Sequence, residues 1–298
     1  APVPAPWPVP APAPVPVAAV AASGGAATGP KQNGGAPPSS YLSPYCSPRC
    51  RFSIASRSHV GCVRQINQDA CLELNFSFYE KSELRHAQFL AVIDGMGGEA
   101  EGDKAASIAL RSIGQAVVSA CLTLRDSRQT SPLLDSDPLK KYPQILSRAL
   151  ETANRNIYDY SCLNEARRGM GCTISCCLVV ERDAFFGHVG DTRGYHFRQS
   201  FQPALQQVTT DHSLVGRLVA MGSLTPEEAR VSPQRSIIFR AMGTGPDIEV
   251  DTYNRCLEVG DRIILCSDGV WEYFEAGEFC RLVESCQSPE EVCHTLVD

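Results

Sequence analysis

Several signals that would place a chain in a common class of protein are absent from this sequence. The 298 residues contain no apolar run near the roughly 18 residues of a membrane span. The first residues lack a basic start, and prolines interrupt their apolar region, so a secretory signal peptide is not expected. The formal net charge is −6, which argues against nucleic acid as the main partner. We therefore expect a protein that binds neither membranes nor nucleic acids.

Paired cysteine motifs are also absent, although the chain contains 14 cysteines. No CxxC occurs, and the six histidines do not have the spacing of zinc ligands. Four cysteines lie inside apolar runs, where a free thiol behaves as a small hydrophobic side chain: Cys172, Cys176, Cys177 and Cys266. These features predict a reduced, cytoplasmic protein. No GxSxG motif is present either, so a serine nucleophile of that kind is not expected.

Two apolar segments lead to the most informative residues of the chain. Residues 89–93 run directly into Asp94, and residues 262–266 are followed after one residue by Asp268; glycine comes next in both cases. Carboxylates at the ends of buried strands, with glycine beside them so that the backbone can come close, suit a divalent cation bound by oxygen. Asp-Gly is also a common turn dipeptide, so the repetition is what favours a metal site.

Composition divides the chain near residue 50. Residues 1–50 are rich in Ala, Pro and Gly and contain no acidic residue, which predicts a disordered tail. The pattern of apolar residues in 51–298 predicts one folded domain. It indicates two long helices between residues 106 and 160 and a meander of short strands between residues 173 and 197. Because strands and helices are segregated along the chain, we predict an α+β fold with antiparallel sheets.

Asp69, Asp191 and Asp211 belong with Asp94 and Asp268 to an ordered series of motifs. The series is Gly61-x-Val63-Arg64-x-x-Asn67-Gln68-Asp69, Asp94-Gly95-Met96-Gly97-Gly98, Gly169-Met170-Gly171-x-Thr173, Gly190-Asp191-Thr192-Arg193-x-Tyr195, Asp211-His212-Ser213 and Ser267-Asp268-Gly269. It resembles the metal-dependent, type 2C protein serine/threonine phosphatases over roughly residues 51–298. Met96, where many eukaryotic members carry His, makes the chain similar to the bacterial-type branch. The segment from Arg217 to Thr244 is similar to that branch's flap.

The resemblance implies a sandwich of two antiparallel β-sheets flanked by helices (α-β-β-α), with two Mn²⁺ or Mg²⁺ ions in a cleft at one end. Asp94 would bridge both ions, the Gly95 carbonyl would bind one of them, and Asp268 would bind the other. A third, weaker ion would involve Asp191, with Asp268 or Glu272 nearby. Asp69 and Gln68 would hold waters that are bound to the ions.

The implied activity is hydrolysis of phosphoserine and phosphothreonine in proteins by a water that bridges two divalent ions, which lower its pKa and neutralise the phosphoryl group. Phosphorylated proteins would be the partners, and we expect a monomer. Arg64 is the predicted phosphate clamp, because a guanidinium can bind two phosphate oxygens at once. For His188 and His212 we predict strand packing and loop hydrogen bonding rather than acid catalysis.

One feature of the family has no counterpart here. Members carry a further metal-ligating Asp in a Gly-x-x-Asp-Asn-x-Thr segment before a late strand, and the sequence stops at Asp298, in the preceding helix. We therefore expect a C-terminally incomplete domain that lacks this strand and this ligand. The alternative function is a pseudophosphatase that acts as a binding or regulatory module. A metal-dependent nuclease or a small-molecule phosphatase is a third reading, the first disfavoured by the acidic charge balance.

Overall fold

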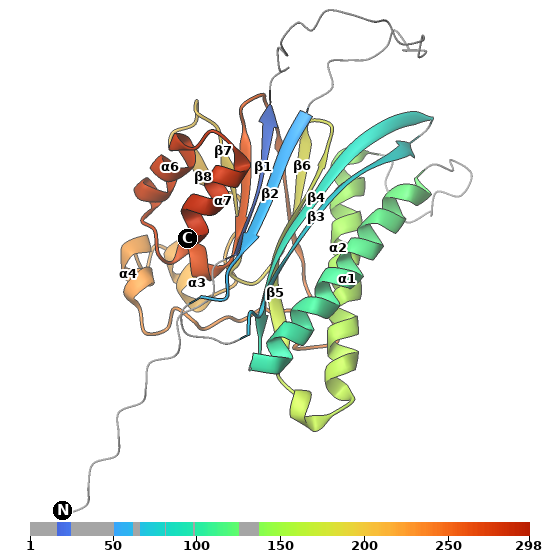
Figure 1. The fold of residues 1–298 in the computed structure, drawn as a ribbon. Helices are drawn as coiled ribbons and strands as arrows, with labels where there is room; N and C mark the ends of the chain where they lie inside the picture. Colours follow the sequence, from blue (N-terminus) through green and yellow to red (C-terminus); the bar gives the residue numbers. More distant parts are fainter. Residues whose placement is uncertain (1–16, 25–50, 62–65, 81, 98, 125–136) are drawn as a thin grey trace, which may run out of the picture.

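The computed structural model describes residues 17–24, 51–61, 66–80, 82–97, 99–124 and 137–298. They form two five-stranded antiparallel sheets, packed face to face, with helices on both outer faces (Figure 1). The predicted α+β sandwich is confirmed. Arg64 and most of the N-terminal 50 residues lie outside the described residues, so the predictions made for them stay predictions.

The first sheet has the strand order β3-β4-β5-β6-β9. Its strands are β3 (Asp69–Glu80), β4 (Glu83–Met96), β5 (Gly171–Val180), β6 (Asp183–Val189) and β9 (Asp251–Cys256). All ten residues of β5 are buried, which explains its continuous apolar run in the sequence. In the β3-β4 register, Asp69 lies directly opposite Asp94, so antiparallel pairing brings two acidic residues together at one end of the sheet.

Two long helices cover the outer face of this sheet, α1 (Glu99–Thr123) and α2 (Pro138–Cys162). Helix α2 begins where Asp137 accepts a hydrogen bond from the Leu139 amide at 3.0 Å, with proline at the first helical position. Residues Glu101–Thr123 of α1 are long and apolar enough to cross a membrane by length and composition alone. In the structure, α1 packs on β3, β4 and α2 as a core helix (Figure 1).

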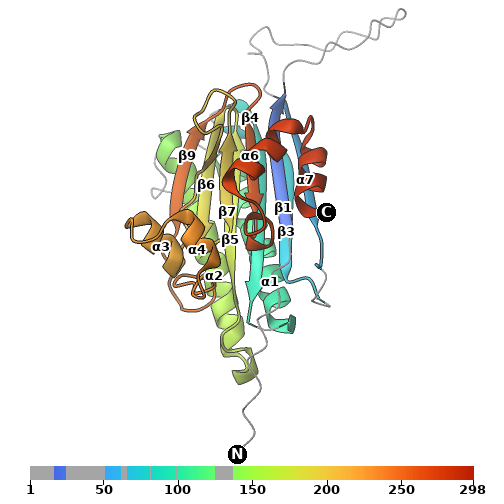
Figure 2. The same ribbon diagram turned by 90° about the vertical axis from the view of Figure 1, so that its left-hand side faces the viewer.

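The second sheet has the strand order β2-β1-β10-β7-β8. Its strands are β2 (Arg51–Ser58), β1 (Val17–Gly24), β10 (Arg262–Cys266), β7 (Arg193–Phe197) and β8 (Leu205–Gln207). Helices α6 (Ala276–Ser285) and α7 (Pro289–Val297) cover its outer face (Figure 2). Four short helices complete the described part: η1 (Glu165–Arg167), α3 (Leu214–Ala220), α4 (Pro226–Val231) and α5 (Asp268–Trp271).

Strand β1 corrects the prediction that residues 1–50 form a disordered tail. Val17–Gly24 lies between β2 and β10 and pairs antiparallel with both, for example Ala18 with Cys266 and Ala22 with Ser53. Residues 17–24 contain no proline, whereas prolines recur through residues 1–16, so every residue of β1 can donate its backbone N–H to a ladder. Composition alone pointed to disorder because alanine-rich segments have little intrinsic preference for strands. The expected lack of a C-terminal strand stays a prediction.

Removing β1 should destabilise the protein, because β2 and β10 would each lose a hydrogen-bonded neighbour inside the sheet. We expect deletion of residues 1–24 to lower the melting temperature by about 5 °C or more. Deletion of residues 1–16 leaves β1 in place and is the matched control. Thermal unfolding followed by circular dichroism makes the comparison. Equal melting temperatures for the two deletions would show that β1 does not stabilise the sheet.

Candidate active site

Four aspartates from four separate segments gather at one end of the sandwich. Asp69 opens β3, Asp94 lies near the end of β4, Asp191 follows β6, and Asp268 opens α5 directly after β10. Asp94 interacts electrostatically with the other three. The Ser267 hydroxyl donates a hydrogen bond to Asp69 at 2.8 Å and so connects the two sheets at this point. The predicted acidic residues therefore meet, although they are separated by up to 199 positions in the sequence.

The carboxylates of this cluster are difficult to ionise together. Burial raises the pKa of Asp94 well above its usual range, and the charges of Asp69 and Asp191 raise it further. Burial also raises the pKa of Asp268 well above its usual range, followed by the charges of Asp94, Asp191 and Glu272. The pKa of Asp191 rises to about 7, mainly through burial and then through the charge of Asp211. Such a group of like charges is what a bound divalent cation would neutralise.

The donor set fits Mg²⁺ or Mn²⁺, which prefer oxygen ligands. Asp268 Oδ1 is buried without a hydrogen-bond partner, whereas the Asp94 and Asp268 side chains as a whole keep partial exposure. A Cβ at position 102 would lie 2.2 Å from Gln68 Nε2 and 2.9 Å from the Gly95 carbonyl oxygen, so glycine at 102 lets the Gln68 side chain and this oxygen approach the start of α1. Among the described residues, no three His, Cys, Asp or Glu side chains are grouped tightly enough to enclose an ion. Mg²⁺ usually keeps several of its waters and is held by one or two carboxylates, which Asp94 and Asp268 could supply.

Glycines allow the segments of the site to approach one another. A Cβ at Gly95 would lie 2.2 Å from the Gly102 carbonyl oxygen, so the end of β4 and the first turns of α1 meet in van der Waals contact here. Gly190 has φ +111°, and a Cβ there would lie 2.2 Å from the Thr173 side chain. Only glycine combines this backbone conformation with this contact, and the turn that it makes carries Asp191.

Glu272 and Gln68 also lie at the cluster, as predicted. The Glu272 amide donates to the Asp268 carbonyl at 3.0 Å, and the Glu272 carboxylate lies 3.7 Å from the Arg235 guanidinium. The Gln68 carbonyl accepts a hydrogen bond from the Gly95 amide at 3.1 Å. Arg64 lies outside the described residues, so its predicted role as phosphate clamp stays a prediction.

The sequence motifs contain Arg193 and Asp211 but indicate no role for either, and they do not include Trp271. The Arg193 guanidinium donates to both carboxylate oxygens of Asp211, at 3.0 Å and 2.7 Å, and lies over the Trp271 ring at 3.5 Å. The Trp271 indole N–H donates to the Asp191 carbonyl at 3.1 Å. Together they form a buried support behind the Asp191 turn. The sequence signal was the arginine two residues after Asp191, but its partner and the ring beneath it depend on the tertiary structure.

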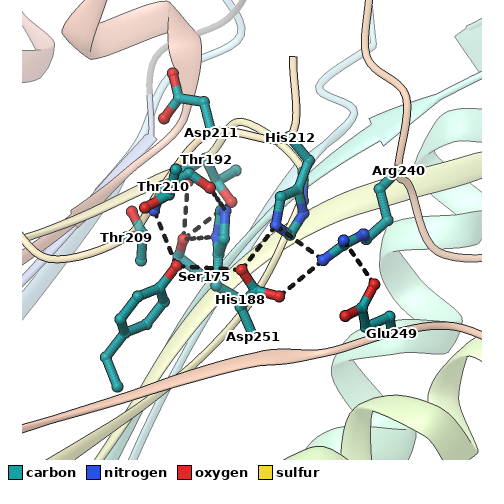
Figure 3. A network of polar contacts seen from close by, with 12 residues as sticks. Ser175, His188, Thr192, Thr209, Thr210, Asp211, His212, Arg240, Glu249 and Asp251 are labelled. Carbon is teal, nitrogen blue, oxygen red and sulfur yellow. Dashed lines mark hydrogen bonds and ion pairs between the residues drawn. The ribbon is translucent and has the colours of Figure 1, made fainter. Parts of the chain in front are cut away.

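Two histidines hydrogen-bond the loops around this support (Figure 3). His188 is fully buried, and its Nδ1 lies 3.0 Å from the Ser175 hydroxyl and its Nε2 3.1 Å from the Thr210 carbonyl oxygen. Burial lowers the pKa of His188 to about 4 and also lowers the pKa of His212. Both rings are therefore neutral near pH 7, and their contacts agree with the predicted packing and loop-bonding roles.

Comparison with known families identifies the family to which the chain belongs. The family described as protein phosphatase 2C matches residues 57–296. The chain belongs to the protein phosphatase 2C family. This phosphatase is similar to the serine/threonine phosphatase stp of Listeria monocytogenes, with 28% identity over 235 residues that cover 79% of this chain and 84% of the relative. It is also similar to the protein phosphatase PhpP of Streptococcus pneumoniae, with 31% identity over 208 residues that cover 70% and 77% of the two chains.

Solved structures of relatives have the same fold. The serine/threonine phosphatase Stp1 from Staphylococcus aureus superposes with a TM-score of 0.62 at 30% identity, covering 79% of this chain and 84% of that one. The catalytic domain of PstP, solved in complex with two manganese ions, superposes with a TM-score of 0.60 at 29% identity, covering 82% and 88%. The resemblance to the bacterial-type branch is thus confirmed, as is the enzyme class, a protein serine/threonine phosphatase.

The carboxylate cluster predicts a pH dependence for the metal-free phosphatase. The folded-state pKa of Asp191 is about 7, and those of Asp94 and Asp268 are also raised, so the folded state holds protons that the unfolded state has released above about pH 4. Stability in EDTA should therefore fall as the pH rises from about 4 to 7, by up to about 1.4 kcal/mol per pH unit for each such carboxyl.

Melting temperatures at pH 5 and pH 8, in EDTA and in MnCl₂, test this dependence. Mn²⁺ should remove most of the loss at pH 8, because the ion neutralises the ionised carboxylates. Asp94→Asn should flatten the dependence in EDTA and weaken the Mn²⁺ effect. A metal-free protein that is more stable at pH 8 than at pH 5 would contradict this account of the cluster.

Proposed function

We propose that this protein phosphatase 2C hydrolyses phosphoserine and phosphothreonine in protein substrates, with two Mn²⁺ or Mg²⁺ ions held at Asp94, Gly95 and Asp268. The observation that carries the proposal is the cluster of buried carboxylates with raised pKa values, in which Asp268 Oδ1 has no hydrogen-bond partner. Relatives named as serine/threonine phosphatases, and the PstP structure in complex with two manganese ions, support the substrate class and the metals.

The position of each carboxylate indicates its role. Asp94 interacts with Asp69, Asp191 and Asp268, so it is the carboxylate of the cluster that two ions could share. Asp268 contributes the buried unpaired oxygen. Asp191, with Glu272 nearby, would hold a third, weaker ion. The bound ions would supply an activated water for in-line attack and would neutralise the phosphoryl group.

Other residues would hold the substrate and the solvent in place. Asp69 accepts the Ser267 hydroxyl, which fixes its carboxylate toward Asp94 and leaves it to orient water in the site. Arg64 stays the predicted clamp for the phosphate oxygens, since a guanidinium matches their geometry. Met96 cannot donate a proton, so we assign protonation of the leaving alkoxide to solvent at the site. A peptide hydroxyl is the leaving group for phosphoserine and phosphothreonine alike.

A pseudophosphatase is the alternative reading, and the cluster argues against it. Gathering Asp94, Asp191 and Asp268, whose pKa values are all raised, destabilises the metal-free fold. A module that only binds a partner protein gains nothing from this destabilisation, whereas an enzyme that needs two cations requires the carboxylates that cause it. The metal-binding residues themselves therefore favour catalysis.

Hydrolysis of a phosphothreonine peptide should require added Mn²⁺ or Mg²⁺ and should stop in EDTA. Asp94→Asn should lower kcat/KM by about three decades or more, about 4 kcal/mol of transition-state stabilisation, because it removes a charge shared by both ions. Asp183→Asn makes the same chemical change at the start of β6, the end of that strand away from Asp191, and is the matched control. Near wild-type turnover of Asp94→Asn at saturating Mn²⁺, or full activity in excess chelator, would overturn the proposal.

A further inference from the structure

We infer that His212 is a positioning residue that couples the flap (residues 217–244) to the turn carrying Asp191. The inference rests on the proposed role of Asp191 at the metal site. His212 lies between the two regions, only 4% exposed, and it hydrogen-bonds Gly190 in the turn and Phe239 in the flap. Figure 3 shows its ring beside Asp251 and Arg240. No contact of His212 in the structure is with the carboxylates of the site, so it would act through Gly190 rather than on the substrate.

On one side, His212 is joined to Gly190 by two hydrogen bonds. The His212 amide donates to the Gly190 carbonyl at 2.6 Å, and the Gly190 amide donates to His212 Nδ1 at 3.0 Å. Gly190 is already constrained, because its φ is +111° and Thr173 packs against it. A displacement of the His212 ring would therefore be transmitted to this turn rather than absorbed by it, and Asp191 is the next residue.

On the other side, the ring of His212 is held from the return segment of the flap. Arg240 Nη1 lies 3.1 Å from His212 Nε2 and donates to Asp251 Oδ1 at 2.8 Å. Because Nδ1 accepts from Gly190, the proton of the neutral ring is on Nε2, where Asp251 Oδ2 accepts it at 3.2 Å. Asp251 thus selects the one tautomer that can receive the Gly190 amide, and Arg240 acts on the ring by holding Asp251 in place.

The backbone around His212 joins both ends of the flap. The Phe239 amide donates to the His212 carbonyl at 2.9 Å, and the Leu214 amide donates to the Ile237 carbonyl at 2.8 Å. At the far end of the flap, Met242 pairs with Cys172, whose neighbour Thr173 is the strand partner of Asp94. The flap therefore starts and returns next to the carboxylate cluster, with His212 as the side chain between its base and Gly190.

Two substitutions each remove one of the two hydrogen bonds of the His212 ring and keep the other. In His212→Asn the side-chain oxygen can take the place of Nδ1 and still accept from Gly190, while the contact with Asp251 is lost. In His212→Gln the side-chain amide reaches the position of Nε2 and can still pair with Asp251, while the acceptor for Gly190 is lost. A purely structural role for His212 would make both variants less stable without distinguishing them.

The measurement is amide hydrogen exchange of Gly190 in the metal-free protein, read residue by residue by NMR. His212→Gln should speed exchange at Gly190 by about tenfold, the effect of losing one hydrogen bond, and His212→Asn should restore most of the protection. Because neither metal nor substrate is present, this result does not depend on phosphatase activity. Equal exchange rates at Gly190 in the two variants would overturn the inference.

A third variant keeps the test decisive if either substitution at His212 prevents folding. Arg240 is a partly exposed flap residue that reaches Gly190 only through Asp251 and His212, and Arg240→Ala should speed exchange at Gly190 several-fold by freeing Asp251 and with it the His212 ring. Arg155→Ala, which removes an exposed arginine–aspartate pair elsewhere on the surface, is the matched control. Gly190 exchange unaffected by Arg240→Ala would show that the flap and the turn are not coupled through His212.

Discussion

The mutual repulsion of four carboxylates at one end of the sandwich is the constraint on which the rest of this structure depends. Antiparallel pairing sets Asp69 opposite Asp94, and the ends of β6 and β10 add Asp191 and Asp268. Burial and like charge raise the pKa values of Asp94, Asp191 and Asp268. Such a group destabilises this end of the fold when metal is absent. In the proposed function, divalent cations would neutralise the carboxylates and allow a phosphate dianion to bind there.

Residues around the cluster hydrogen-bond the turn that carries Asp191 and the segments next to it. Arg193 makes its hydrogen bonds to Asp211 rather than to Asp191, although its charge also lowers the pKa of Asp191. Trp271 and His212 reach the Asp191 turn through backbone groups, which leaves the Asp191 carboxylate to the site. The flap is anchored in a similar way, since buried Asn154 accepts from the Gly243 amide at 2.7 Å and donates to the Gly245 carbonyl at 3.0 Å.

Much of the site could be predicted because its residues follow local rules. Apolar strands ending in Asp94 and near Asp268, glycine beside each, and the ordered motifs all lie within short stretches of sequence. Asp298 lies at the end of α7, where it pairs with Arg57 at 2.6 Å. Strand β1 was missed because a sheet position between two strands outweighs the weak propensity of alanine. The bonds from His212 to Gly190 and Asp251 were also out of reach, since partners 22 and 39 residues away are set by the tertiary fold.

Anomalous diffraction from crystals grown in MnCl₂ tests the central claim most directly, because it locates manganese without relying on activity. Two strong peaks should lie beside Asp94, one of them near the Gly95 carbonyl and the other near Asp268, with a weaker third near Asp191. Manganese bound only at other acidic surface residues, with no peak beside Asp94 in a crystal that retains this fold, would contradict the account.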